Sequence, residues 1–316
     1  MSGAILLALA PVFFVLALGY AAGRLRVVDN HQIDGLNALV MNFALPASLF
    51  VATASASRSE MVSQAPLFAV FGAVMLMIWL ISYFFRRAFL KTSQANASLQ
   101  ALTIAYPNLA GVGLPIVSAV LGPSGTVPIA VALAAGSILV TPLSLILVEV
   151  GGAKSDEIAG KSSLRILEAF RRSLTRPVVL APALGILFSL MDWNLGAVAD
   201  ACLTLIGRAA AGVALFLTGL ILSAQSFRLD GKVVVATGMA DIARPLLTAA
   251  IVFALPLAPE TGKTAILLGA MPSGFFGILF AVNYRLDSAT PGSMVLASTL
   301  FSIVTMALAI SVLFPS

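Results

Sequence analysis

The sequence predicts an all-α integral membrane protein, with ten transmembrane helices arranged as two inverted five-helix repeats. Three observations predict this class: composition, the length and number of the apolar runs, and the distribution of basic residues. Of the 316 residues, 60% are hydrophobic and 10% are charged, and the mean hydropathy is +1.05. Because a soluble domain has nearer to about 25% charged residues, most of this chain is expected to lie in lipid.

Ten apolar runs are long enough to cross the roughly 30 Å hydrocarbon core of a membrane at about 1.5 Å per helical residue. The sixth run is the shortest. The first run has no Lys or Arg before it, which is the reverse of a signal peptide, so it is expected to remain as a membrane helix. The expected spans are 4–23, 33–54, 64–85, 97–121, 126–149, 177–191, 200–223, 233–256, 262–283 and 292–314.

The basic residues alternate between the two membrane sides as ten spans require. Loops after the odd-numbered spans hold 14 of the 18 Lys and Arg residues, whereas the opposite side holds only Arg58 and Lys263. The basic side is cytoplasmic by the positive-inside rule. We therefore expect a multi-pass protein of the cell inner membrane with both termini on the outer, periplasmic side.

One long polar connection divides the chain. Residues 1–150 are predicted to form the first five-helix repeat and residues 177–316 the second. Residues 151–176 are predicted to be a cytoplasmic linker with an amphipathic helix, because apolar residues recur there at helical spacing among charged ones. A regulatory or partner-binding role for this linker is the alternative.

Corresponding positions support the repeat. Phe50 matches Phe216, and Pro107 matches Pro272, at offsets of 166 and 165 residues. Five helices in each half make the second copy inverted relative to the first.

The fourth and ninth spans carry helix-breaking residues at these matched places, in Tyr106-Pro107-Asn108 and in Met271-Pro272-Ser273-Gly274. Paired interruptions in two halves point to a transporter binding site. If the two breaks cross, free N–H groups at Asn108 and Ser273 favour an anion, while the carbonyl ends near Tyr106 and Met271 favour a cation. The alternative is a pair of kinks filled by neighbouring helices. The predicted substrate-binding residues here are Pro107, Asn108, Pro272, Ser273 and Gly274.

A second candidate lies in the eighth span, where Asp241 and Arg244 stand near mid-membrane depth. Their i, i+3 spacing allows them to pair on one helix face, and charges at this depth face a bundle interior or a cavity. Asp241 is a candidate proton carrier, and Arg244 is its counter-charge or a ligand for a substrate carboxylate; a purely structural pair is the alternative. Asn42, in the turn that Pro46 opens, either lines the same cavity or caps freed backbone.

Other features exclude some classes and roles. The basic residues lie in short loops rather than on one face, which argues against nucleic-acid binding. No nucleotide-binding loop is found, and no cofactor or metal is expected. The single Cys202 is expected to be a small buried side chain, and His31, beside Asp29 and Asp34, to be a solvated surface residue.

Four motifs resemble the auxin efflux carrier family of permeases, which includes plant auxin exporters and bacterial malonate and malate permeases. The likeness covers nearly the whole chain, and the short length is similar to that of a bacterial member. The motifs are Asn42–Phe50 (NFALPASLF), Tyr106–Pro115 (YPNLAGVGLP), Met271–Gly274 (MPSG) and Ser298–Ser302 (STLFS).

This resemblance implies a fold similar to that of bile acid sodium symporters, in which the fourth and ninth helices cross at their prolines and a transport domain moves against a scaffold as an elevator. It carries site roles onto Pro107, Asn108, Pro272 and Ser273. No Asp or Glu lies near either proline, which argues against sodium coupling. The acid and base that support the site in plant carriers have no counterpart in the second span beyond Asp34, so that role falls to Asp241 and Arg244 or is absent.

The expected function is therefore secondary active transport, or facilitated movement, of small organic anions such as malonate, malate or auxin-like acids. The expected partners are this anion and membrane lipids. Proton coupling, a homodimer and the direction of transport are left open. A lipid-modifying intramembrane enzyme and a channel or receptor are the alternatives; the sequence has no catalytic constellation for the first and no repeated polar stripe for the second.

Overall fold

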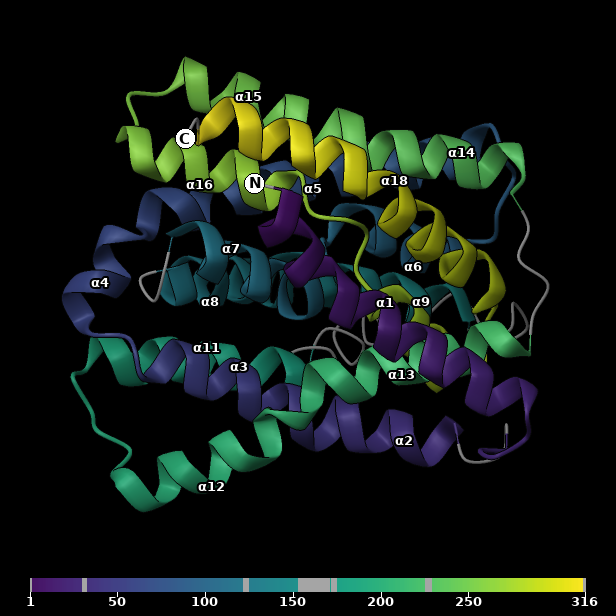
Figure 1. The fold of residues 1–316 in the computed structure, drawn as a ribbon, viewed down its shortest axis with the longest axis horizontal. Coiled ribbons are helices and arrows are strands. Elements are labelled where there is room, and N and C mark those ends of the chain that lie inside the picture. The colour runs from purple at the N-terminus through teal and green to yellow at the C-terminus, as the bar shows by residue number, and fades with distance from the viewer. Residues whose placement is uncertain are drawn as a thin grey trace, which may run out of the picture.

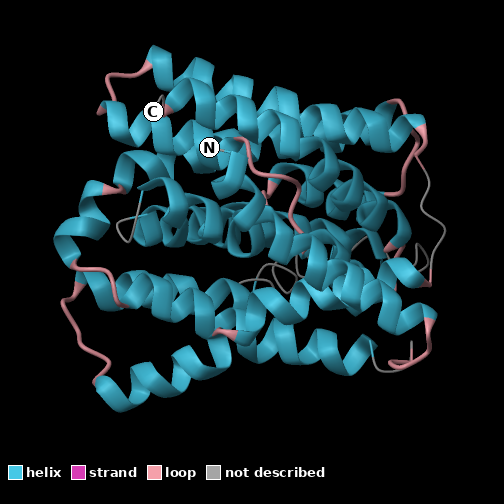
Figure 2. Ribbon diagram, viewed as in Figure 1, coloured by secondary structure: helices cyan, strands magenta, loops and turns pink. Residues whose placement is uncertain are grey.

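The computed structural model describes residues 2–29, 33–121, 125–152, 171, 175–224 and 229–314. Within these ranges the chain is helical, with no strand (Figures 1 and 2). Six helices of the described part are long and apolar enough to cross a membrane. The all-helical membrane class is therefore confirmed. The predicted amphipathic helix of the linker and His31 lie outside the described residues.

The helices gather into two bundles, because the most extensive helix contacts are those of α1 with α13 and of α3 with α11 and α12 on one side, and of α5 with α6, α6 with α9 and α15 with α16 on the other. Most of the first bundle lies in the lower part of Figure 1, and α1 runs down toward it from the N-terminus in the upper half. Its elements are α1 (Ser2–Arg24), α2 (Ile33–Leu39), the π-helical η2 (Val40–Ala44), α3 (Leu45–Ala54), α11 (Pro177–Leu190), α12 (Ala197–Gly207) and α13 (Ala209–Ser223).

The second bundle fills the rest of the molecule, and the short helix α4 (Arg58–Ser63) leads into it from α3. Its elements are α5 (Ala65–Ala88), α6 (Gln94–Ala105), η3 (Leu109–Gly113), α7 (Leu114–Leu121), α8 (Thr126–Ala135), η5 (Gly136–Val140), α9 (Thr141–Gly152), α14 (Gly231–Gly238), η7 (Met239–Ala243), α15 (Arg244–Ala254), α16 (Pro259–Gly269), α17 (Phe276–Asn283) and α18 (Ala289–Leu313).

Each of the π-helical segments η2, η3, η5 and η7 ends two residues before a proline: Pro46, Pro115, Pro142 and Pro245. Proline has no N–H, and its ring clashes with the carbonyl four residues earlier. The preceding turn therefore widens, and the residue just before the proline bonds the carbonyl five residues back, as Leu45 does with Val40 and Arg244 with Met239. Proline thus builds wide turns into spans that still run on as helices.

The outer surface is apolar where lipid would cover it, as at Phe253, which is 83% exposed. Cys202 is also exposed, so the prediction that it is buried was wrong. The reason is that α12 packs mainly on α3 by one face, and its other face carries exposed Val198 and Leu205.

Small residues bring α1 and α13 into backbone contact. A Cβ on Gly219 would lie 2.0 Å from the Leu16 carbonyl oxygen, and one on Gly19 would lie 2.0 Å from that of Phe216. Such close approach is how helices associate in lipid, where hydrophobic burial gives no driving force between them. Gly212, on the same helix α13, has nothing within 4 Å of its virtual Cβ.

These two glycines of α13 make a matched test of the interface. Gly219→Ala should lower the free energy of unfolding by about 1–3 kcal/mol, because a methyl group there overpacks rigid backbone. Gly212→Ala should be neutral or slightly stabilising, since alanine favours the helix. Thermal unfolding of the purified protein in detergent measures both; equal effects of the two substitutions would contradict the packing account.

Candidate functional site

The two broken spans meet each other at their breaks. Pro107 lies opposite Ser273 in an isolated antiparallel bridge. The Asn108 N–H donates to the Pro272 carbonyl, and the Gly274 N–H donates to the Tyr106 carbonyl, both at 2.8 Å. The backbone at each break thus forms hydrogen bonds with the backbone at the other. The sequence matched Pro107 with Pro272, whereas in the structure Pro107 lies opposite Ser273.

This pairing corrects the expectation of free N–H groups at Asn108 and Ser273. The first is bonded to Pro272 as described, and the Ser273 N–H donates to the Ser298 hydroxyl at 2.8 Å. Buried backbone donors are costly to leave unpaired, so the fold provides an internal acceptor for each. The helix that follows the second break begins only at Phe276, which places its free amino end after Ser273.

Close approach of the two breaks requires glycine. A Cβ on Gly274 would lie 2.5 Å from the Tyr106 carbonyl oxygen, and one on Gly277 would lie 2.5 Å from that of Leu99. A larger side chain at Gly274 would push the bridge apart, and one at Gly277 would push α17 away from α6. The predicted role of Gly274 in close backbone contact therefore holds, although its neighbour is the other break.

Tyr106 fastens the first break to the rest of the second bundle. Its hydroxyl donates to the Leu133 carbonyl at 2.7 Å and lies 3.1 Å from the Ser137 hydroxyl. The ring packs over Gly136 and lies 4.5 Å, centroid to centroid, from the Phe276 ring. The wide turn η5 therefore holds the end of α6 in place.

Arg244 lies between the carbonyl ends of both broken spans and is fully buried. Its Nη1 donates to the Ile104 carbonyl of α6 at 2.6 Å, and its Nε donates to the Gly269 carbonyl of α16 at 2.9 Å. Its Nη2 donates to the Met271 carbonyl. A single guanidinium thus caps the negative ends of two helix dipoles, where cations are stabilised. The predicted preference for a cation near Met271 is met by the protein's own side chain.

Asp241 accepts a hydrogen bond from Ser298 rather than from Arg244. Its Oδ1 lies 2.8 Å from the Ser298 hydroxyl, which also accepts from the Ser273 N–H. Among the ion pairs of the described residues, none joins Asp241 directly to Arg244. The two charged residues therefore make different contacts at the crossing. Arg244 donates to the carbonyl ends of the broken helices, and Asp241 contacts the second break through Ser298.

Two polar atoms of this cluster have no partner. Asp241 Oδ2 and Ser273 Oγ are buried without a hydrogen bond, and both residues are 1% exposed. Buried polar atoms are nearly always paired, so two orphans in one hydrogen-bonded cluster make it the candidate site among the described residues.

Some of the residues at the crossing were predicted from the sequence, and others were not. Asn108 is 2% exposed at the crossing, but Asn42 is exposed in η2. Ser298 was noted only as part of a motif and not as a site residue. In the sequence, Ser298 is a serine within the apolar run that follows the second break. Serines of this kind are too common in membrane helices to identify a site residue.

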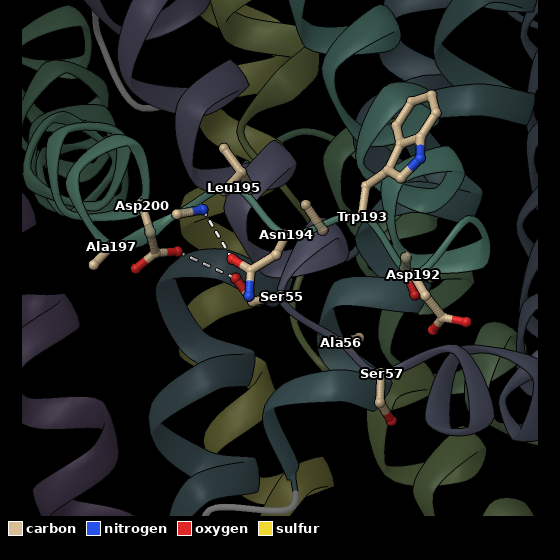
Figure 3. Close-up of a pocket in the computed structure, with 12 residues that line it drawn as sticks. Ser55, Ala56, Ser57, Asp192, Trp193, Asn194, Leu195, Ala197 and Asp200 are labelled. Atoms are coloured by element: carbon tan, nitrogen blue, oxygen red, sulfur yellow. Dashed lines mark hydrogen bonds between the residues drawn. The ribbon is translucent and has the colours of Figure 1, made fainter.

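The cavities described in the structure lie away from the crossing. Figure 3 shows one of about 560 Å³ near the ends of α3 and α11, with Ser55, Asp192, Trp193, Asn194 and Asp200 among its lining residues. Asp200 accepts from the Ser55 hydroxyl there at 3.3 Å. None of the predicted substrate-binding residues lines this cavity.

Known proteins of similar sequence are membrane transporters. The chain is 30% identical over 301 residues to "Uncharacterized transporter YfdV" of Escherichia coli (strain K12), which covers 94% of each chain. It is 24% identical to a "Putative malonate transporter" of Rhizobium meliloti, over 93% of this chain and 91% of that one. It is 22% identical to auxin efflux carrier component 8 of Arabidopsis thaliana, over 87% and 88%.

The family profile described as membrane transport protein matches residues 4–310. That span includes both breaks, Asp241 and Arg244. The resemblance noted in the sequence is therefore confirmed: the chain belongs to the membrane transport protein family, the auxin efflux carrier family of transporters.

Proposed function

We propose that this protein moves small organic anions across the inner membrane as a secondary transporter or facilitator, by alternating access around the crossed breaks. The observation that carries the proposal is the buried Arg244 between two broken helices whose neighbouring cluster contains unpartnered polar atoms. Membership of a transporter family supports it, and so do the names of relatives that refer to malonate and auxin.

The proposed architecture has ten spans in two inverted repeats. Six helices cross by length, two shorter apolar helices are Phe13–Arg24 and Pro177–Leu190, and the two broken pairs α6 with α7 and α16 with α17 supply the remaining crossings. The antiparallel pairing of the two breaks is the arrangement that inverted copies would produce.

In an elevator mechanism, the first bundle is the scaffold and the second bundle is the moving part. All the crossing residues, including Tyr106, Arg244 and Ser273, belong to elements or connections of the second bundle. They would therefore travel together and keep the site geometry intact during movement.

Arg244 supplies the positive charge that other transporters of this kind take from a bound ion. Carbonyl ends of broken helices are where coupling cations are held, and here three such carbonyls accept from one guanidinium. The proposal therefore needs no sodium ion. The buried positive charge also attracts an anionic substrate to the adjoining helix amino ends.

Charge balance then suggests how a proton would be coupled. Arg244 and an ionised Asp241 are together neutral, so an arriving carboxylate would leave a net negative charge in a buried site, which is costly. Protonation of Asp241 restores neutrality for a substrate that carries one negative charge, such as indole-3-acetate or hydrogen malonate. An anion and a proton would therefore bind together, and Ser298, which has one donor and two acceptor sites, can face either form of Asp241 while still accepting from Ser273.

Counterflow in proteoliposomes tests the function. Vesicles loaded with unlabelled malonate should take up labelled malonate, whereas malonamide, the matched neutral compound, should not compete. Indole-3-acetate and malate are the further probes. Electrical conductance without counterflow would indicate a channel, and failure of every carboxylate would reject the anion proposal.

Ser273→Ala tests whether the orphan hydroxyl contacts substrate. It removes an oxygen that has no internal partner, so stability should change little. The KM for malonate should rise roughly 5- to 30-fold, the value of a lost hydrogen bond of ~1–2 kcal/mol. Ser189→Ala removes a similarly buried, unpartnered hydroxyl at the cavity of Figure 3 and should leave uptake unchanged; if both variants behave alike, Ser273 does not bind substrate.

Asp241→Asn tests the proton coupling. The amide oxygen can still accept from Ser298, but it cannot take up a proton. An acidic exterior should drive malonate accumulation in vesicles of the unaltered protein and not of the variant, while malonate exchange at equal pH persists in both. Asp200→Asn, remote from the crossing, is the control, and a variant that still follows the pH gradient would exclude Asp241 as the proton carrier.

Arg244→Lys tests whether the Arg244 guanidinium takes the place of a bound cation at the carbonyl ends of the broken helices. A lysine is a compact point charge and cannot span three carbonyls of two helices, so at least one buried acceptor is left unpaired, at about 1–3 kcal/mol each. The melting temperature should fall clearly, whereas Arg87→Lys at an exposed position should be neutral. Replacing sodium by choline at constant ionic strength should not change the unaltered protein's uptake; a sodium requirement would overturn this role of Arg244.

A further inference from the structure

Three side chains join the two bundles at the end of α17 that lies away from the second break. Arg176, at the start of α11 in the first bundle, donates from Nη2 to the Tyr284 hydroxyl at 2.8 Å. That hydroxyl donates in turn to Oε1 of Glu149, in α9 of the second bundle, at 2.9 Å. Arg176 and Glu149 are also 3.9 Å apart as an ion pair.

Tyr284 is well suited to the centre of this network. Its hydroxyl both accepts and donates, so one oxygen links the cation to the carboxylate. The Arg176 guanidinium also lies over the Tyr284 ring, 5.3 Å from its centroid. Burial raises the pKa of Tyr284 to about 12, so the hydroxyl keeps its proton throughout the physiological range.

The backbone fixes where Tyr284 stands. It is the residue at which α17 ends, and its N–H bonds the Phe280 carbonyl at 2.8 Å. Arg285 then takes a left-handed φ of 53°, which lets the Leu286 N–H return to the Ala281 carbonyl at 2.8 Å. This closing turn holds the tyrosine at the tip of α17.

The other side of α17 is also tied to the first bundle. Asn37 of α2 donates from Nδ2 to the Leu279 carbonyl at 3.0 Å, in a buried contact. The Asn37 Oδ1 has no partner, so this tie is incomplete and contributes less than a fully satisfied amide would. The Arg176 network is therefore the principal polar connection between α17 and the first bundle.

We propose that Arg176, Tyr284 and Glu149 form a gate that holds α17 against the first bundle and opens when the second bundle moves. The side chain of Arg176 is 32% exposed and that of Glu149 is 14% exposed, so water can replace their mutual bonds at modest cost. A reversible contact differs in this respect from the buried capping by Arg244. The gate rests on the proposed function in one respect, namely that the two bundles move relative to each other.

Cysteine accessibility tests the gate without any substrate. Leu279→Cys places a reporter at a fully buried position beside Asn37, in a Cys202→Ser background that removes the exposed native thiol. Maleimide labelling of this reporter should be slow, and Tyr284→Phe should raise its rate about fivefold, the factor expected from one net hydrogen bond. Arg176→Gln should act similarly, and the two together should add little.

Two controls separate a gate from general loosening. Tyr83→Phe alters a tyrosine of α5 that stacks on Trp79 and should leave labelling unchanged. A second reporter, Val74→Cys, lies in the buried interior of the second bundle and should stay unlabelled in Tyr284→Phe. If the Leu279 reporter lowers the melting temperature, faster hydrogen exchange confined to α17 replaces it as the readout.

The outcomes are distinct. Unchanged labelling at position 279, or equal increases at positions 279 and 74, overturns the gate. Malonate uptake by the same proteins is measured in parallel. If the unaltered protein moves none of the carboxylate probes, the proposed function fails, while the labelling result still decides whether the gate exists.

Discussion

Broken backbone inside a membrane must find its hydrogen-bond partners within the protein, and the central architecture of this protein follows from that constraint. The two breaks supply partners to each other through Asn108 and Gly274. The carbonyls that remain are taken by Arg244, and the remaining Ser273 N–H by Ser298. A guanidinium is suited to this place because its planar fork carries five donors and no acceptor.

Proline has two different effects in this chain, and the difference decides where chemistry can occur. At Pro107 and Pro272 the helix stops, and two segments must be paired across the bundle. At Pro46, Pro142 and Pro245 the helix continues through a wide turn. The wide turn η7 contains Asp241 and ends directly before Arg244. One widened turn therefore places both charged residues beside the two breaks at Pro107 and Pro272.

The sequence was sufficient for the membrane class, the positions of both breaks and the burial of Asp241 and Arg244, because proline and charged residues are rare and costly in lipid. The sequence was not sufficient to predict the hydrogen-bond partners of these residues. Arg244 binds backbone carbonyls, which every residue has, so no side-chain pattern could identify Ile104 or Gly269 as its acceptors. Pairing with Asp241 looked natural from i, i+3 spacing, yet three carbonyl ends satisfy a guanidinium more completely than one carboxylate would.

The helix α17 connects the proposed site with the proposed gate. It has 8 residues, or about 12 Å at the usual rise, and it follows the second break at one end and carries Tyr284 at the other. A helix this short transmits displacement as a rigid rod rather than by bending. A change of charge at Asp241 that alters the Ser298 bond to Ser273 would therefore act on the element that Arg176 holds, and this is the contact through which the proposed function would couple substrate to movement.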